Sequence, residues 1–106
     1  MDKTGKPNFL QNKAILRTIF RANPEERAEL LNSVGTSVIQ TFVSIAYNSR
    51  KGRLDLTPYE LSKLAVYRTH INLLLSPKFP LKLKRQLLID NPELVTRLLK
   101  PLVDLF

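Results

Sequence analysis

Three prolines, each placed directly after a helix-capping residue, constrain the fold more firmly than any other feature of the chain. They lie in residues 23–26 (NPEE), 57–60 (TPYE) and 91–93 (NPE). Asparagine or threonine caps a helix start, proline tolerates the first helical position, and an acid there meets the positive end of the helix dipole. In residues 57–60 the threonine and glutamate also have the spacing of a capping box. These signals predict helices that begin at positions 24, 58 and 92.

The apolar residues between these starts follow helical spacing, with no sustained strand alternation. The pattern predicts a first helix over residues 8–21, an apolar central helix over 38–46, one helix over 58–75, a short helix after Pro80 and a last helix that Pro101 kinks. Gly35 either separates two helices or is tolerated within a longer one at about 1 kcal/mol. We therefore expect an all-α fold, a single compact bundle of five to six helices over residues 8–106, after a flexible arm over residues 1–7.

Composition argues against catalysis and against a metal or cofactor. The 106 residues include no cysteine and one histidine, so no metal site can be built from those two residue types. The glycines stand apart at positions 5, 35 and 52, which excludes a glycine-rich phosphate loop. Glu25, Glu26 and Glu29 lie at a helix start, where they serve the dipole. We expect a protein that is not an enzyme, without cofactor or metal.

No apolar run approaches the roughly 20 residues of a membrane span, and the first residues lack the apolar segment of a signal peptide. The sequence therefore predicts no membrane span and an intracellular location, in a nucleus or a virion.

The charge is strongly positive and unevenly distributed. Seventeen Lys and Arg face nine Asp and Glu, for a net charge of +8 and an isoelectric point near 10.1. Residues 49–85 hold nine of the cations and only two acids, a local excess of +7. A localised excess of this size on a small domain is typical of nucleic-acid binders.

Two basic segments lie within that region. Residues 50–53 (RKGR) place three cations around a glycine that permits close approach to a phosphate; the alternative is a solubilising loop. In residues 76–88 (SPKFPLKLKRQLL), Lys78, Lys82 and Arg85 share one face of a helix, whereas Lys84 falls nearer the apolar side and must snorkel. The alternative there is a solvated helix face. The predicted nucleic-acid-binding residues are Arg50, Lys51, Arg53, Lys78, Lys82 and Arg85.

The aromatic and C-terminal apolar residues have other predicted roles. The spacing of Tyr47, Tyr59, Tyr67 and Phe79 favours core packing over stacking on bases. The last helix carries a broad apolar stripe that either docks on the domain's own core or pairs with another copy, and its mixed polar face argues against an anionic membrane. The residues proposed for oligomerisation are Leu94, Val95, Leu98, Leu102 and Phe106.

Residues 28–85 resemble the small basic proteins of Polinton (Maverick) and adintovirus-type elements. The resemblance rests on a helix ending in Asn and a Lys-Gly turn, a Leu-Thr-Pro helix start and a later Leu-Lys-x-Lys-Arg segment. The matching residues are Ala46, Asn48, Lys51, Gly52, Leu56, Thr57, Pro58, Leu81, Lys82, Lys84, Arg85 and Leu87. The chain departs from the family at residues 91–93, where the family often has a Gly-Gly-containing tail. The resemblance implies a viral or element-encoded protein.

Residues 38–67 are similar in layout to the second half of a histone fold, in which paired chains present basic loops to DNA. Together these observations predict a DNA-packaging or architectural protein that acts on double-stranded DNA as an oligomer and binds phosphates without reading sequence. The choice between DNA and RNA stays open. The alternative is a helical virion structural or host-interaction adaptor that binds an acidic protein surface.

Overall fold

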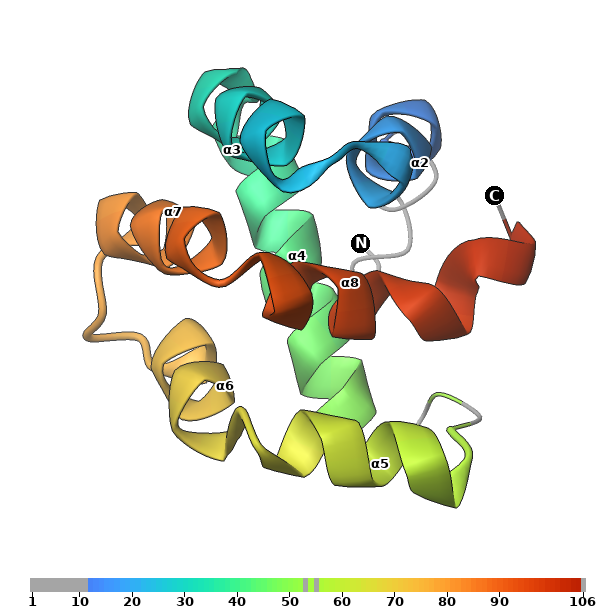
Figure 1. The fold of residues 1–106 in the computed structure, drawn as a ribbon. Helices are drawn as coiled ribbons and strands as arrows, with labels where there is room; N and C mark the ends of the chain where they lie inside the picture. Colours follow the sequence, from blue (N-terminus) through green and yellow to red (C-terminus); the bar gives the residue numbers. More distant parts are fainter. Residues whose placement is uncertain (1–11, 53, 55, 106) are drawn as a thin grey trace.

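Helix α4 (Thr36–Arg50) runs through the middle of the molecule, and the other helices pack around it (Figure 1). The protein is described from a computed structural model, which describes residues 12–52, 54 and 56–105. Residues 36–49 carry no charge, and five apolar side chains of α4 are buried: Val38, Ile39, Phe42, Ile45 and Ala46. The predicted central core helix is therefore confirmed.

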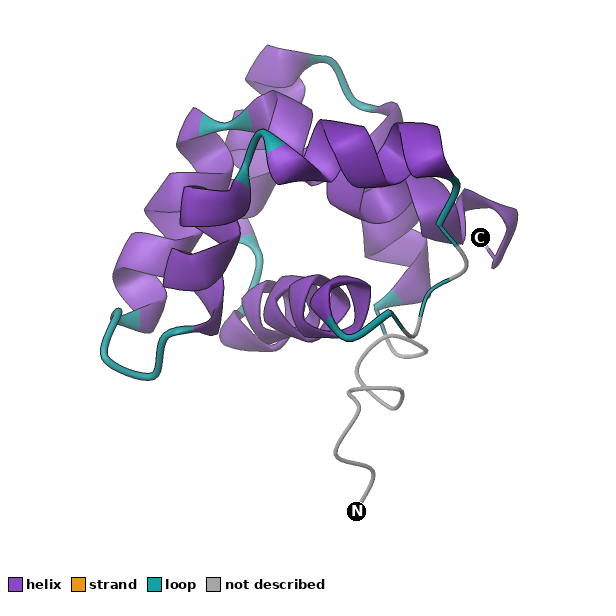
Figure 2. Ribbon diagram, turned by 90° about the horizontal axis from the view of Figure 1, so that it is seen from below, coloured by secondary structure: helices purple, strands orange, loops and turns teal. Residues whose placement is uncertain are grey.

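The remaining helices surround α4. In the order of the chain they are α2 (Lys13–Arg21), α3 (Pro24–Ser33), α5 (Pro58–Ala65), α6 (Arg68–Leu75), α7 (Leu81–Asp90) and α8 (Pro92–Leu99), followed by the 3₁₀ helix η1 (Lys100–Leu105). Helix α3 packs on α2 and α7, α6 packs on α4, and α8 contacts α2, α4 and α5. Figure 2, turned by 90°, shows only helices and loops among the residues it colours.

The described residues thus form an all-α globule with seven α-helices and no strand, rather than five or six helices. Its radius of gyration is 12.5 Å, close to the roughly 13 Å expected for a compact domain of this length. The histone-like layout is not confirmed. The predicted arm over residues 1–7 and the first residues of the predicted first helix lie outside the described residues.

All three predicted helix starts are confirmed, and a capping box forms at two of them. The side chain of Asn23 accepts from Glu26 N, and that of Thr57 accepts from Glu60 N. Each glutamate accepts in return from the backbone N–H of its capping residue. At the third start the helix also begins at the proline, but Asn91 donates its side-chain amide to Leu87 O instead of capping α8.

The segment over residues 58–75, predicted as one helix, is divided into α5 and α6 at Val66 and Tyr67. A straight helix of that length would extend about 27 Å. The break lets α5 pack on α8 while α6 packs on α4 and α7. Tertiary packing therefore overrides the local helical pattern here. Gly35 separates α3 from α4 and is the N-cap of α4. Helix α8 ends at Leu99, and Lys100 and Pro101 begin the 3₁₀ helix η1.

Lys84 turns toward the apolar interior of the bundle, as its position on α7 predicts. The side chain is only 9% exposed, and this burial lowers the pKa of its ammonium group. Burial of a charge disfavours the charged form and costs stability at neutral pH, where the folded and unfolded chains are both protonated.

Replacing Lys84 with methionine should therefore raise the free energy of unfolding by on the order of 1 kcal/mol near neutral pH. The pKa of Lys84 is lower in the folded chain than in the unfolded one. The wild-type protein therefore gains stability as pH rises from the folded to the unfolded pKa of this lysine. Urea midpoints near pH 7 and about pH 10 should therefore converge for the two proteins. Lys82→Met, at an exposed position of the same helix, is the control. A lower midpoint for Lys84→Met near pH 7 would contradict the prediction.

Candidate nucleic-acid interface

The first basic segment forms the end of α4 and the turn that follows it. Arg50 is the last helical residue and Lys51 the C-cap, whose N–H donates to Tyr47 O at 3.0 Å. Gly52 then reverses the chain with φ +71°, a conformation that favours glycine over any residue with a side chain. Arg53 lies outside the described residues. Both Arg50 and Lys51 are exposed, so this turn presents two cations to solvent.

These two cations are positioned by neighbouring side chains. A nitrogen of the Arg50 guanidinium donates to Asn72 Oδ1 on α6, which directs the side chain toward that helix. The Lys51 ammonium lies 5.6 Å from the centre of the Tyr47 ring, a cation–π distance. Tyr47 is 38% exposed and Tyr59 is 58% exposed, so the core-packing prediction is wrong for these two. Tyr67 and Phe79 are partly buried against the core, as predicted.

The second basic segment does not act as one face. Lys78, in the turn before α7, and Lys82, in its first turn, are exposed. Arg85 instead donates to Leu31 O at 2.7 Å and to Val34 O at 2.6 Å, and so caps the C-terminus of α3. A cation at the negative end of a helix is stabilising. The residue predicted to bind phosphate thus has a structural role in this fold.

Arg68, which the sequence interpretation missed, joins Arg50 at the first segment. Both residues line the same pocket between the end of α4 and helices α5 and α6. No sequence pattern links Arg68 to the basic turn, because it lies 18 positions after Arg50 and reaches the same pocket only when α6 packs on α4. The described structure therefore brings Arg68 to the pocket that Arg50 lines, and Lys51 follows Arg50 in the chain. Lys78 and Lys82 are not among the residues that line this pocket.

Few of the cations in the described part of the chain are paired with an acid. Among the described residues the ion pair is that of Arg97 with Glu93, at 2.9 Å. Glu93 raises the pKa of Arg97, chiefly through this hydrogen bond. In the same part of the chain, Arg50, Lys51, Arg68, Lys78 and Lys82 have no acidic partner. Arg21 and Lys100 are also exposed and without an acidic partner among the described residues, but they lie outside the two basic segments.

Arg27 is a second arginine that the sequence interpretation missed, and its role is structural. It is 7% exposed and lies at the junction of α2, α3 and α8. Its guanidinium donates to Ile19 O, Phe20 O and Ala22 O at the end of α2, and to Pro92 O and Thr96 Oγ1 of α8, at 2.8–3.1 Å. Burial lowers the pKa of Arg27, and the carbonyl groups at the helix end offset that cost.

The apolar stripe of the last helix is docked within the chain. Leu94, Val95 and Leu98 are fully buried in the core, and Leu102 is nearly so. Phe106, the fifth residue proposed for oligomerisation, lies outside the described residues. The stripe therefore docks on the domain's own core, which is the first of the two alternatives that the sequence left open. The four described side chains leave no exposed surface there for a second copy.

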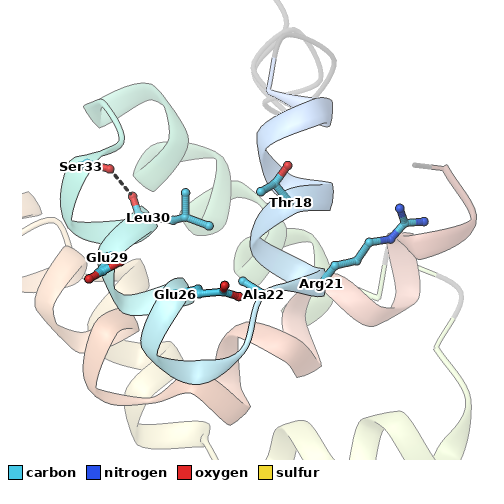
Figure 3. A pocket seen from close by; sticks show the side chains of 7 residues that line it. All are labelled: Thr18, Arg21, Ala22, Glu26, Glu29, Leu30 and Ser33. Carbon is cyan, nitrogen blue, oxygen red and sulfur yellow. Dashed lines mark hydrogen bonds between the residues drawn. The ribbon is translucent and has the colours of Figure 1, made fainter.

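A larger pocket, of about 690 Å³, lies between α2 and α3 on the other side of the molecule (Figure 3). It is lined by Thr18 and Arg21 of α2, by Ala22 directly after that helix, and by Glu26, Glu29, Leu30 and Ser33 of α3. Glu26 is already engaged in the capping box, and Arg21 extends away from both glutamates in Figure 3. With two acids among its lining residues, this pocket is unsuited to an anionic ligand.

Searches for relatives add no identification, because no protein-family model, no curated protein and no solved structure matches the chain. Among the described residues, no helix is both long and apolar enough to cross a membrane. The same part of the chain contains no group of three or more His, Cys, Asp or Glu side chains arranged to hold a metal ion.

Proposed function

We propose that this protein binds the phosphate backbone of nucleic acid without reading its sequence, in a packaging or architectural role. The observation that carries the proposal is the group formed by Arg50, Lys51 and Arg68. Arg50 and Arg68 line one pocket, Lys51 follows Arg50 in the chain, and no acid in the described part of the chain pairs with any of the three. Phosphates are the ligands that such clustered cations attract, with release of the counterions condensed on the nucleic acid.

Lys78 and Lys82 extend the proposed interface, and Arg85 contributes to it mainly by holding α7 against α3. No base-reading element is part of the proposal, because phosphate contacts position a protein on a duplex but carry no sequence information. Double-stranded DNA is the proposed ligand. A viral or element-encoded origin and a location in a nucleus or virion belong to the same proposal, on the strength of the resemblance and the charge.

The alternative adaptor function gains support from apolar side chains near the cations. Leu61 on α5 and Val66 at the α5–α6 break are exposed beside the pocket that Arg50 and Arg68 line. An acidic protein surface with apolar residues would match this mixture, whereas a phosphate backbone makes no use of it.

The salt dependence of DNA binding tests the proposed function. Neutralising three phosphates gives a slope of about −2.7 in log K against log salt, and five give about −4.5. Raising salt from about 50 to 200 mM should therefore weaken binding roughly 40-fold if three cations engage DNA and roughly 500-fold if all five do. Fluorescence anisotropy with two duplexes of unrelated sequence measures both the slope and the lack of sequence preference. Absence of binding at the lower salt concentration would overturn the proposal.

A further inference from the structure

The pocket beside Arg50 and Arg68 has a composition that phosphate binding does not require. It has a volume of about 180 Å³, opens to solvent and is lined by residues from the end of α4, from α5 and from α6. Four of its lining residues are aliphatic: Leu61, Leu64, Ala65 and Ile71. No aromatic residue lines it, so it offers no platform for stacking a base. One liquid water occupies about 30 Å³, so the space corresponds to roughly six waters or one short aliphatic group.

Ser49 also lines the pocket, but its hydroxyl does not serve a ligand there. The residue is only 8% exposed, and the hydroxyl oxygen is covered by the surrounding protein. The hydrogen-bond donors that a ligand in the pocket can reach are therefore those of its two arginines.

The charged groups of the pocket favour an anionic ligand. Arg50 and Arg68 are adjacent lining residues without an acidic partner in the described part of the chain. The hydrogen bond to Asn72 holds the Arg50 guanidinium on the α6 side and leaves its other N–H groups available. Guanidinium groups pair with carboxylates through two parallel hydrogen bonds, which fixes the orientation of the bound group.

We propose that this pocket binds a carboxylate carried on a short aliphatic stem of about four to five carbons. The carboxylate pairs with the guanidinium groups of Arg50 and Arg68, and the stem lies against Leu61, Leu64, Ala65 and Ile71. Two sources share this chemistry, namely a free aliphatic acid and the C-terminal residue of a peptide. The site goes beyond the proposed function, because it shares two arginines with the phosphate contacts but depends on apolar walls that DNA does not need.

The test is a titration of the full-length ¹⁵N-labelled protein, followed by the amide signals of residues 49–51 and 61–71. Hexanoate represents the free acid and N-acetyl-leucine the peptide terminus. Hexanol, N-acetyl-leucinamide and inorganic phosphate each lack one half of the proposed ligand. We expect saturable shifts with at least one of the two acids, at an affinity at least fivefold above that for each of the three control compounds.

Two variants locate the binding. Ala65→Leu fills the pocket without changing charge, at an exposed helical position, and should weaken acid binding at least fivefold while leaving DNA binding unchanged. Arg68→Gln should weaken acid binding at least fivefold as well. Arg21→Gln, on α2, is the matched control and should bind the acid like the wild-type protein.

Three outcomes overturn the inference: neither acid binds, phosphate binds as tightly as the acids, or Ala65→Leu binds the acid like the wild-type protein. None of them bears on the salt-dependent binding of DNA, so the two proposals fail separately.

Discussion

Replacing Arg27 with methionine should lower the free energy of unfolding by about 3 kcal/mol or more. The arginine is almost completely buried, and all five of its hydrogen bonds go to groups at the end of α2 and the start of α8. Methionine keeps much of the volume but removes all five hydrogen bonds, and a hydrogen bond to a charged group contributes about 1.5–3 kcal/mol. A domain of this size has only about 5–15 kcal/mol of stability.

Urea denaturation followed by circular dichroism measures this loss, with Arg21→Met as the matched control. Arg21 is exposed on the last turn of α2, so its replacement should change stability by no more than about 0.5 kcal/mol. Arg27→Lys keeps the charge but loses the planar fork, and should recover only a minor part of the loss. If Arg27→Met unfolds at the urea concentration of the wild-type protein, the hydrogen bonds described here do not hold the three helices together.

Reversing the charges of Arg50 and Arg68 together should weaken DNA binding at least tenfold at about 50 mM salt. Each arginine that no longer neutralises a phosphate also removes about 0.9 from the slope of log K against log salt. The double variant, Arg50→Glu with Arg68→Glu, should therefore show a slope shallower by about 1.8. Both residues are exposed, so we expect the fold to be retained.

The control for this variant is Arg21→Glu with Lys100→Glu, which removes the same amount of net charge from exposed positions on α2 and at the end of α8. Long-range attraction to DNA depends on the total charge of the protein, whereas the proposed phosphate contacts depend on where the individual cations lie. If the two double variants weaken binding equally, the cations around Arg50 have no special role and the protein attracts DNA only through its overall charge.

The parts of the fold that depend on neighbouring residues could be predicted from the sequence. Capping residues act within three positions of a helix start, and so Asn23 and Thr57 indicated where α3 and α5 begin. The break at Val66 and Tyr67 could not be found in this way. No proline or glycine marks it, and it forms because α5 and α6 pack on different neighbours.

The candidate site, too, could be predicted only where its residues are neighbours in the sequence. The basic turn was visible because its cations are consecutive, whereas Arg68 joins it only through the packing of α6 on α4. Arg85 looked like a phosphate ligand because charge alone does not distinguish a solvated arginine from one that caps another helix. Part of the positive charge, that of Arg27 and Arg85, therefore stabilises helix ends inside this chain.

The two arginine caps also bear on how the chain acquires its structure during synthesis. The contacts of Arg27 to the end of α2 span only five to eight positions, so the α2–α3 pair can form as soon as both helices exist. The cap on α3 comes from Arg85, more than 50 positions later, and the link to α8 spans 65 and 69 positions. Helices of eight to ten residues are unstable alone. While α7 and α8 are still inside the ribosome, the end of α3 therefore lacks its arginine cap. We expect the first half of the chain to become stable only when the last quarter, which begins at α7, has emerged.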